Sequence, residues 1–410
     1  MSSKTATSAS LSLVAEPPVG GEAKPKCSHF GSCGGCQLQH FAYEAQLALK
    51  RRRVESLLSP LGIQIGAVHP SPDLWYYRNK MEFSFGDVYP PQSGGPTLKL
   101  GLKPRGKWYD ILDLQECFLL SPETPALLKA VRAWSVREGV PPYNSHRSQG
   151  VLRHLVVREA KNGPDRLVLL VTTPAEIPTA SLVESVCAAY PATSVLWGVN
   201  GKISDTAISD KVGPVFGQPY ITETLRLSGR ELSFRVSPHS FFQTNTRGAE
   251  VLYGLLRRWV KELAPQAALD LFCGGGGIAL SLADVCGKVY GAELNASAIE
   301  DARQNAKLNG IDNVDFYSGE VQTLLPAMLA LGAEVVVLDP PRAGLHPSAL
   351  PPLLEKGPAR LIYVSCNPEA LARDLAKLMP TYVVRRAEIV DLFPHTEHVE
   401  TVVELKRDKL

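Results

Sequence analysis

The sequence has no long hydrophobic run and only a small excess of charge. None of its apolar stretches approaches the ~20 residues that span a bilayer, and the segment Met1–Ser12 is small and polar instead of basic and then apolar. We therefore expect no transmembrane helix, no secretory signal, no membrane partner and a cytoplasmic location. The net charge of +2 over 410 residues indicates by itself no polyanionic partner.

The few excess charges are unevenly distributed along the chain. Residues 1–160 carry 19 basic and 13 acidic side chains, whereas residues 161–410 carry 24 basic and 28 acidic ones. A basic first part is compatible with nucleic-acid binding there, although charge alone favours an ordinary solvated surface. The composition, 45% hydrophobic and 20% charged, excludes full disorder and predicts a globular chain of two or three domains.

The eight cysteines are unlike a disulfide framework, because thiols stay reduced in the expected compartment. Metal-binding or catalytic roles are therefore considered first. Cys27, Cys33 and Cys36 form a tight cluster, and Cys117 stands alone 81 residues after Cys36. Four thiolates suit either zinc or an iron–sulfur cluster, and the spacing leaves both open.

Three regions follow one another along the chain. Residues 1–26 are rich in Ser, Ala, Pro and Gly without a period, which predicts a disordered tail. Residues 27–235 begin with a helix over Tyr43–Leu58, whose polar side carries Lys50–Arg53, and continue as short β-branched and aromatic runs. A single helix, Pro122–Glu138, is expected to interrupt this β-rich region.

Residues 236–410 alternate between amphipathic helices and short buried strands. Strands at this spacing predict an α/β fold with a parallel, doubly wound sheet, closed at the end of the chain by an antiparallel hairpin. The strands expected here are Ala267–Phe272, Lys288–Glu293, Glu334–Asp339, Arg360–Ser365, Tyr382–Phe393 and Thr401–Lys406.

A glycine run follows the first strand of this last region. Leu269–Gly277 reads as a buried strand that ends in four consecutive glycines, and Glu293 ends the next strand 16 positions later. Such a turn lets a ligand approach the backbone, and the acid accepts hydrogen bonds from ribose hydroxyls. The G-x-G-x-x-G order of dinucleotide binders is absent, so the pattern suits S-adenosylmethionine, with an unliganded tight turn as the alternative.

Three further polar groups follow strands at the same predicted edge. Asp339 ends a buried strand before two prolines, which indicates a ligand unless it caps a helix. Cys366 leaves the sheet ahead of a helix and is either a nucleophile or an inert core thiol. A carboxylate in the loop before the last strand is a candidate base, and the residues alone leave Glu397 and Glu400 equally open.

Seven segments together resemble the RNA uridine 5-methyltransferase family. They stand in the order of the family and span nearly the whole chain: Phe30–His40, Tyr77–Glu82, Gly150–Leu155, Ser237–Asn245, Asp339–Leu345, Val364–Pro368 and Phe393–Thr401. The resemblance implies a Rossmann-like class I methyltransferase domain, residues 236–410, preceded by a β-rich iron–sulfur and RNA-binding region, residues 27–235.

The resemblance also implies roles for individual residues. Cys366 is the expected nucleophile and Glu400 the expected general base. A 4Fe-4S cluster is implied on Cys27, Cys33, Cys36 and Cys117. Contacts to S-adenosylmethionine are implied for Gln243, Phe272, Gly277, Glu293, Glu320 and Asp339.

The substrate implied by the resemblance is RNA, and we expect a monomer acting on 23S rRNA. Relatives that carry the cluster but lack a small N-terminal β-barrel resemble the bacterial enzymes of large-subunit rRNA, whereas bacterial tRNA enzymes of the family generally lack the cluster. A uridine 5-methyltransferase of tRNA stays an alternative. An RNA cytosine 5-methyltransferase is disfavoured, because no cysteine stands beside the prolines in Asp339–Arg342. A non-catalytic iron–sulfur RNA-binding protein is disfavoured by the presence of both Cys366 and Glu400.

Overall fold

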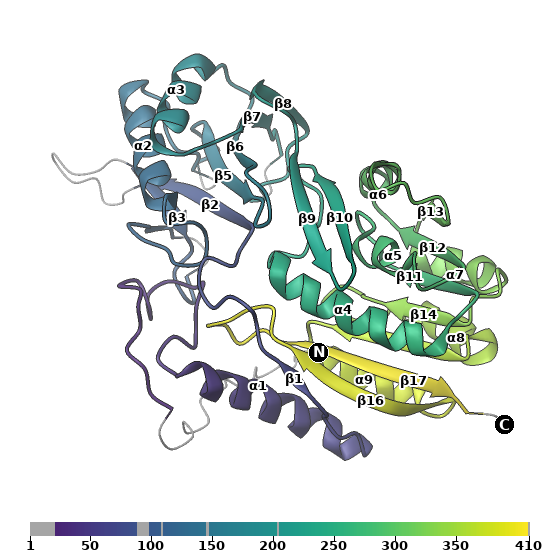
Figure 1. Ribbon diagram of the computed structural model, residues 1–410. Coiled ribbons are helices and arrows are strands. Elements are labelled where there is room, and N and C mark those ends of the chain that lie inside the picture. Colours follow the sequence, from purple (N-terminus) through teal and green to yellow (C-terminus); the bar gives the residue numbers. More distant parts are fainter. Residues whose placement is uncertain (1–20, 88–97, 108–109, 145–146, 203–204, 409–410) are drawn as a thin grey trace, which may run out of the picture.

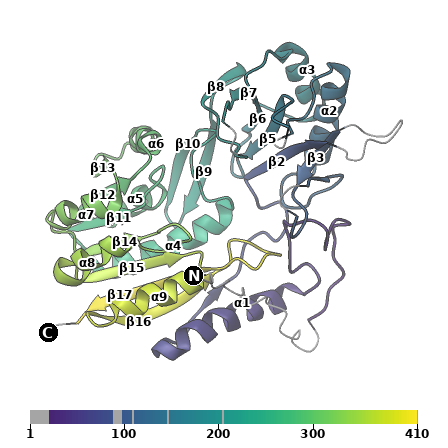
Figure 2. The same ribbon diagram turned by 180° about the vertical axis from the view of Figure 1, so that it is seen from behind.

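The structure is a computed structural model that describes residues 21–87, 98–107, 110–144, 147–202 and 205–408. Figures 1 and 2 show two lobes, each built on its own sheet, with a two-stranded ribbon between them. Most of the expected tail lies outside the described residues. Residues 21–26 differ from that expectation, since Glu22 forms a β-bridge with Phe41. In the described part of the chain, every helix is too short or too polar to cross a bilayer.

The first lobe is a seven-stranded sheet with the order β4-β3-β2-β5-β6-β7-β8. The short runs predicted as strands are strands. The expectation of a single helix is wrong, because α3 follows β6 and packs with α2 over one face. The elements are β2 (Lys80–Asp87), β3 (Leu98–Leu102), β4 (Leu112–Asp113), α2 (Thr124–Arg137), β5 (Leu152–Glu159), β6 (Arg166–Thr172), α3 (Thr179–Ala189), β7 (Ser194–Val199) and β8 (Lys211–Phe216).

The second lobe is an eight-stranded sheet with the order β1-β16-β17-β15-β14-β11-β12-β13. The doubly wound sheet and its antiparallel closing pair are confirmed, whereas β13 and α7 were not predicted. The strands are β1 (Val68–His69), β11 (Ala267–Leu271), β12 (Lys288–Glu293), β13 (Val314–Ser318), β14 (Val335–Leu338), β15 (Arg360–Ser365), β16 (Tyr382–Val390) and β17 (Glu400–Arg407). The helices are α4 (Thr246–Leu263), α5 (Gly277–Leu282), α6 (Ala296–Leu308), α7 (Val321–Leu329), α8 (Leu350–Lys356) and α9 (Pro368–Leu378).

The parallel strands at the centre of this sheet are buried on both faces. Every residue of β11 and β14 is buried, as expected for strands covered by helices on each side. The ribbon of β9 (Ile221–Leu227) and β10 (Arg230–Val236) instead alternates buried and partly exposed residues. It packs its buried side against α4 and α6 of the second lobe. Its buried residues also share one core with Leu167 and Leu169 of β6, so the ribbon joins the two lobes.

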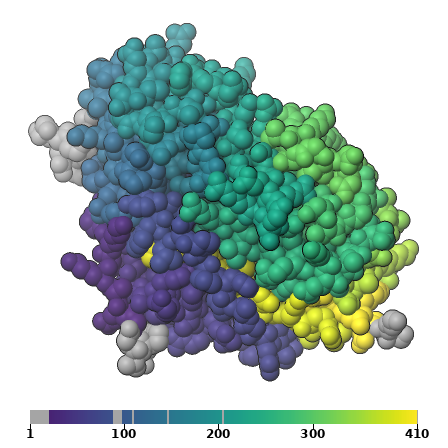
Figure 3. Space-filling view, in the orientation of Figure 1, coloured from purple at the N-terminus to yellow at the C-terminus, as the bar shows by residue number. Residues whose placement is uncertain are grey.

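The helix α1 (Tyr43–Leu58) precedes the first lobe in sequence but packs on the second. Val54 and Leu58 are fully buried in one core with residues of β15, β16 and β17, and β1 pairs in parallel with β16. Figure 3 shows this N-terminal segment against the C-terminal strands. The prediction that Lys50 lies on the polar side of α1 is wrong, since its side chain is buried and ion-paired with Asp391.

Candidate active site and cysteine pocket

The carboxyl ends of five parallel strands meet at one edge of the second sheet. Leu271 of β11 pairs with Leu338 of β14, and Leu338 pairs with Tyr363 of β15. Side chains that directly follow these strands therefore gather at this edge, where open α/β sheets bind their ligands. The predicted site residues that do so are Phe272, Gly277, Glu293, Glu320, Asp339 and Cys366.

The glycine run forms a tight turn between β11 and α5. Phe272, Gly274 and Gly276 have positive φ angles of 70°, 52° and 86°, a conformation that costs glycine little. A Cβ at Gly277 would lie 2.8 Å from Tyr253 Oη, so a side chain there requires Tyr253 to move. The turn therefore needs glycine for its backbone and for its contact with α4.

Glu293 ties the glycine turn to the end of β12. The backbone nitrogen of Gly274 donates to Glu293 Oε2 at 3.3 Å, and that of Asn295 donates to Oε1 at 2.8 Å. Glu320 lies one strand further along the edge, at the start of α7, and accepts a hydrogen bond from Gln322 at 3.1 Å. Both carboxylates thus stand where the prediction expects contacts to a bound nucleoside.

Gln243 lies in the segment before α4, and this segment passes close to the glycine turn through Phe241. Its side chain is almost fully buried at 7% exposure, and its backbone oxygen accepts a hydrogen bond from Asn79 Nδ2 at 2.7 Å. Asn79 immediately precedes β2, so the first lobe holds this segment in position. Phe241, two residues earlier, is 64% exposed and lies against Gly274.

Three carboxyl groups are enclosed together beneath the edge. Burial, together with the nearby Asp339, raises the pKa of Asp270 to about 8, and burial raises the pKa of Asp339 to about 7. Burial raises the pKa of Glu400 well above its usual range, and Asp339 adds to the effect. Asp270 Oδ2 accepts a hydrogen bond from Ala279 N at 2.8 Å, while Oδ1 is buried without a described partner.

Cys366 and Glu400 are neighbours across two antiparallel strands. Ser365, the last residue of β15, pairs with Thr401 of β17, and continuing this register by one residue brings Cys366 opposite Glu400. Burial raises the pKa of the Cys366 thiol to about 11, with Glu400 and Asp339 contributing, whereas Arg342 lowers it. No comparable influence on Cys366 comes from Glu397, which lies three residues before Glu400.

Cationic groups lie around His398 in the loop before β17, and one of them, Arg342, also acts on Cys366. The pKa of His398 falls to about 4, first because of burial and then because of Arg342 and Arg78. The Arg78 guanidinium lies 5.9 Å from the Phe393 ring centre, and the Phe393 ring meets His398 edge-on at 5.8 Å. These residues connect the start of β2 with the loop before β17.

The loop of residues 391–399 is held from below by α1. Lys50 Nζ donates to Asp391 Oδ1 at 2.7 Å and to the Phe393 carbonyl at 2.9 Å. Gln46 accepts a hydrogen bond from the His395 backbone at 2.8 Å and contacts its ring nitrogen at 3.1 Å. The position of Glu400 therefore depends on a helix that is more than 300 residues away in sequence.

The four predicted cluster cysteines come together in the structure. Cys27, Cys33, Cys36 and Cys117 are free, partly buried thiols that line one small pocket. Burial raises the pKa of Cys36 to about 12, and the charges of the other three contribute. The segments are joined by hydrogen bonds, such as that from Gln115 N to His29 Nε2 at 3.0 Å.

The geometry of this cysteine pocket differs from that of a single-ion site. Within the described ranges, no group of three or more His, Cys, Asp or Glu side chains is found that could hold a metal ion. An iron–sulfur cluster is several atoms across and is bound at its corners, so its cysteines stand farther apart than the ligands of one ion. Four thiols around one pocket fit such a group in donor type and number.

Sequence reasoning gave no role to several residues of the site. Asp270 lies inside a strand and was taken as part of the strand–turn motif, although an acid at a fully buried strand position is itself a signal. Arg342 lies in the segment Asp339–Leu345, which carries part of the resemblance, but no function was predicted for it. Tyr253 lies on α4 among apolar residues, and only the fold brings it beside Asp339 and Glu400.

Comparison with known proteins identifies the family. The profile described as tRNA (Uracil-5-)-methyltransferase matches residues 202–330 and 327–408. The chain is 37% identical over 391 residues to an uncharacterized RNA methyltransferase of Clostridium tetani, covering 93% of this chain and 84% of the relative. It is 38% identical over 403 residues to one of Nitratidesulfovibrio vulgaris, covering 95% and 84%.

A solved structure extends this likeness to the fold. The Pyrococcus abyssi tRNA (uracil-54, C5)-methyltransferase, determined with S-adenosyl-L-homocysteine, superimposes with a TM-score of 0.74 at 30% identity. The match covers 92% of this chain and 86% of the archaeal one. The chain therefore belongs to the tRNA (uracil-5-)-methyltransferase family and is an S-adenosylmethionine-dependent RNA methyltransferase.

Proposed function

We propose that this protein methylates carbon 5 of a uridine in 23S rRNA through a covalent adduct with Cys366. The observation that carries the proposal is the position of Cys366 opposite Glu400, at the edge where the glycine turn and Asp339 also lie. Carbon 5 of uracil is a poor nucleophile, so the reaction needs a residue that makes the ring electron-rich.

S-adenosylmethionine supplies the methyl group as a sulfonium cation. The enclosed carboxyls of Asp270 and Asp339 fit such a ligand, because acidic groups held close together are relieved by a positive charge. The free Oδ1 of Asp270 also offers an acceptor beside the glycine turn. Gln243, Phe272, Gly277, Glu293 and Glu320 are the remaining residues that would hold it.

Cys366 acts first. Its thiol gives its proton to water, and the resulting thiolate adds to carbon 6 of the uracil, so that the electron pair of the ring double bond moves toward carbon 5 and the 4-carbonyl. Arg342 is the residue whose charge lowers the pKa of this thiol. Carbon 5 would then form a bond to the methyl group while the bond from that methyl to the sulfonium sulfur breaks, which leaves a neutral thioether. Carbon 5 then carries both the methyl and its original hydrogen.

Glu400 completes the reaction. Its carboxylate removes the proton from carbon 5, the double bond re-forms, and the Cys366 sulfur leaves carbon 6 as the thiolate. Burial and the nearby Asp339 raise the pKa of Glu400 in the free protein, so its carboxylate form is costly there. A cation bound next to Asp339 lowers this cost, so ligand binding prepares the base.

The target base has to leave its stack to reach Cys366. Addition to carbon 6 occurs from the face of the ring, and a stacked base hides both faces. The uridine is therefore flipped out or lies in a single strand. Phe241, exposed beside the glycine turn, offers an aromatic surface at the mouth of the site.

A 4Fe-4S cluster on Cys27, Cys33, Cys36 and Cys117 is part of the proposal. The four free thiols around one pocket support it, and no step of the reaction needs an electron. We assign the cluster a structural role, which is to hold the segment around Cys27–Cys36 against the first lobe. The choice of 23S rRNA rests on this cluster, whereas the archaeal structural neighbour is named as a tRNA enzyme.

Trapping with 5-fluorouridine tests the chemistry and the substrate together. The protein is incubated with S-adenosylmethionine and either 23S rRNA or tRNA transcripts that contain 5-fluorouridine. Fluorine cannot leave as a proton, so the methylated adduct persists and migrates as a protein–RNA band in denaturing gels. We expect the band with 23S rRNA.

Matched variants identify the residues in this assay. Cys366→Ala should form no band. Asp312→Asn should behave like the unchanged protein, because Asp312 is exposed and precedes β13, at the opposite end of this strand from Glu320. A band with tRNA alone would overturn the choice of 23S rRNA and keep the mechanism. A band that persists in Cys366→Ala would overturn the mechanism.

A further inference from the structure

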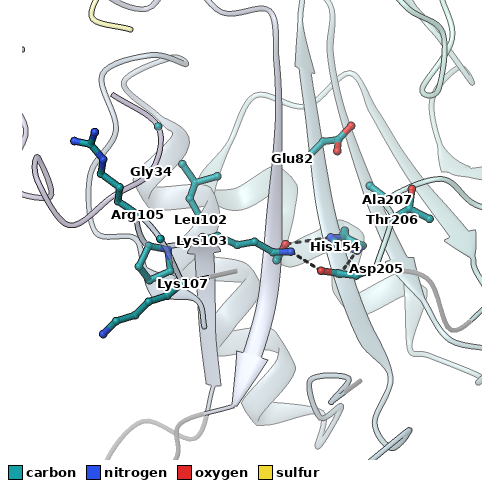
Figure 4. Close-up of a pocket in the computed structure, with 14 residues that line it drawn as sticks. Gly34, Glu82, Leu102, Lys103, Arg105, Lys107, His154, Asp205, Thr206 and Ala207 are labelled. Atoms are coloured by element: carbon teal, nitrogen blue, oxygen red, sulfur yellow. Dashed lines mark hydrogen bonds and ion pairs between the residues drawn. The ribbon is translucent and has the colours of Figure 1, made fainter. Parts of the chain in front are cut away.

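A large cavity lies in the first lobe, outside the site described above. It is a groove of about 750 Å³ between the loop after β3 and the strands β2 and β5 (Figure 4). Lys103, Arg105 and Lys107 line one side of it, and His154 and Asp205 line the other. The position of this groove was not indicated by any sequence motif.

The basic loop that lines the groove is anchored to the cysteine segment. Gly34 N donates to the Lys103 carbonyl at 3.2 Å, and Arg105 N donates to the Ser32 carbonyl at 3.0 Å. A Cβ at Gly34 would lie 2.9 Å from the Lys103 oxygen, so the approach requires glycine. The backbone of residues 103–105 therefore takes its shape from the segment that carries Cys33 and Cys36.

The side chains of this loop are exposed in the groove and hold few partners. Arg105 and Lys107 are exposed, and the guanidinium of Arg105 makes no hydrogen bond or ion pair with a residue that the structure describes. Lys103 reaches across the groove to Asp205 Oδ2 at 2.6 Å, and Asp205 Oδ1 lies 3.3 Å from His154 Nε2. The Asp205 carboxylate thus contacts Lys103 on one wall of the groove and His154 on the other (Figure 4). An anion bound in the groove would make the same contacts.

A second cavity continues the groove toward the catalytic edge. Gly35, Glu82 and Leu102 line both cavities, and the second one adds Arg78, Lys80 and Thr244. Arg78 lies against Phe393 and acts on His398, which Arg342 also influences. Cationic side chains therefore follow one another from Lys107 to the surroundings of Cys366.

The balance of charge along this path favours an anionic ligand. The lining of the two cavities contains five cations, which are Arg78, Lys80, Lys103, Arg105 and Lys107, and two carboxylates, Glu82 and Asp205. Lys80 is paired with Glu82 at 2.5 Å. A ligand with regularly spaced negative charges, long enough to reach from the groove to the catalytic edge, matches this arrangement better than a single small anion.

We propose that this groove binds the sugar–phosphate backbone of the RNA strand next to the target nucleotide, and that Asp205 occupies the place of a phosphate until the RNA displaces it from Lys103. This proposal rests on the proposed function for the identity of the strand as substrate. It adds a binding surface for the flanking nucleotides, which Lys103, Arg105 and Lys107 contact through phosphates.

RNA binding by the full-length protein tests the proposal. The probe is a fluorescein-labelled single-stranded oligo(A) RNA with one central uridine, and all proteins carry Cys366→Ala so that no adduct forms. Replacing Lys103, Arg105 and Lys107 together by Gln should weaken binding about tenfold or more. It should also reduce the slope of log K against log salt by about 2, since each phosphate contact on a single strand contributes about 0.7.

The control variant removes the same charge elsewhere. Lys129, Lys356 and Lys377 are exposed on α2, α8 and α9, and their joint replacement by Gln should leave affinity and salt slope nearly unchanged. Asp205→Asn keeps the shape of the side chain and removes its charge. It should raise RNA affinity about threefold at low salt, where electrostatic contributions are largest.

Two results would overturn the proposal. One is a groove variant that binds RNA with the affinity and salt slope of the control variant while its circular dichroism is unchanged. The other is a loss of RNA affinity in Asp205→Asn, which would make Asp205 a support for Lys103 and not a substitute for phosphate. Failure of methyl transfer, by contrast, leaves this binding assay unaffected and counts only against the proposed function.

Discussion

At the scale of single residues, the catalytic edge combines groups that raise one another's pKa. Burial raises the pKa of Cys366 to about 11, and the adjacent Glu400 is the largest charge that adds to the effect. A thiol with this pKa is almost entirely protonated near neutrality, when it reacts slowly. The free protein thus protects its nucleophile, and any change that removes negative charge around it should increase thiol reactivity.

Glu400→Gln tests this coupling without a methyl-transfer assay. The substitution removes the neighbouring charge, so the pKa of Cys366 should fall and its alkylation by iodoacetamide at pH 8 should become several-fold faster. This follows because each unit of pKa changes the thiolate fraction about tenfold below the pKa. Mass spectrometry of the Cys366 peptide measures the rate separately from the exposed Cys187.

Slower alkylation in Glu400→Gln would contradict this prediction. If Glu400→Gln slows alkylation, Glu400 assists deprotonation of the thiol instead of opposing it, and the electrostatic account is wrong. Glu397→Gln is the matched control, since Glu397 lies in the loop just before Glu400, whereas the charges that shift the pKa of Cys366 are those of Glu400, Arg342 and Asp339. Its alkylation rate should equal that of the unchanged protein.

The raised pKa of Asp270 predicts how the stability of the ligand-free protein depends on pH. Burial raises its pKa from 3.8 to about 8, so the folded state keeps the proton while the unfolded state releases it. The stability from this group is fully present below pH 3.8 and is lost as the pH rises through about 8. Asp270→Asn should therefore raise Tm at pH 8 by a few degrees and have little effect at pH 4.

The hydrogen bond from Ala279 makes Asp270→Asn a conservative change, because an amide oxygen accepts it as well. Asp312→Asn, at an exposed position, controls for the loss of one negative charge and should leave Tm unchanged at both values. Equal Tm shifts of Asp270→Asn at pH 4 and pH 8 would contradict the assigned pKa. Calorimetry across this range measures the effect.

At the scale of elements, α1 supports the loop that precedes Glu400. Lys50 and Asp391 are both completely buried and pair at 2.7 Å. Lys50→Met leaves the Asp391 carboxylate without its cation and should lower the free energy of unfolding by about 3–5 kcal/mol. Because the Phe393 carbonyl also loses its donor, the loop should loosen and methyl transfer should decrease.

A second substitution separates charge from packing in this pair. Asp391→Asn added to Lys50→Met removes the buried charge and should recover part of the lost stability, as measured by denaturant unfolding. If the double variant is less stable than Lys50→Met alone, the hydrogen bonds of Asp391 to Tyr43 and Phe393 matter more than its charge. Arg52→Met, at an exposed position of α1, should cost little.

The elements themselves were largely predictable from periodicity. The strands of the second sheet were found because each is a short buried run before a turn, and α1 and β15 agree with their predicted bounds. The helix α3 was missed because Thr179–Ala189 contains β-branched residues and little charge. The helix α7 contains Pro326, which argues against a helix in sequence.

The site was predictable in part for a different reason. Residues that end parallel strands must meet at one edge, so Asp339 and Cys366 could be brought together from topology alone. The choice between Glu397 and Glu400 required the register of β15 with β17. The burial of Lys50 depends on a partner 341 residues away, and no local pattern encodes that.

The cysteine segment should control the order of the basic loop. Because Arg105 N donates to Ser32 and Gly34 N donates to Lys103, removal of the proposed cluster should loosen both. We expect hydrogen exchange of the Arg105 amide to become at least tenfold faster after the cluster is removed by oxidation and chelation. Exchange in α4, which contacts neither segment, serves as the internal reference.

Unchanged protection of Arg105 after complete removal of iron, judged by loss of visible absorbance, would contradict the structural role. Cys117→Ser offers an independent route to the same state, since it removes one of the four thiols without an oxidant. Both preparations should show weaker RNA binding with a smaller salt slope, because they disturb the loop that holds Lys103 and Arg105.

At the scale of the whole molecule, the division into sequence regions differs from the division into packed units. The helix α1 and the strand β1 come before the first lobe in sequence, yet they extend the core and the sheet of the second (Figure 1). The chain therefore passes from the second lobe to the first and back. The groove proposed to bind RNA in the first lobe and the loop before β17 in the second are linked through this crossing.

Leu58→Ala tests whether α1 stabilises the catalytic lobe. Leu58 is completely buried in a core with Ile389 and Leu405, so the cavity should lower the free energy of unfolding by about 2–5 kcal/mol. The adjacent Leu57 is half-buried and outside this core, so Leu57→Ala should cost less. Hydrogen exchange should show the loss of protection in β16 and β17. If protection is instead lost only in α1 or in the first lobe, α1 is an appendage, and the positioning of Glu400 from this side has to be assigned to the loop itself.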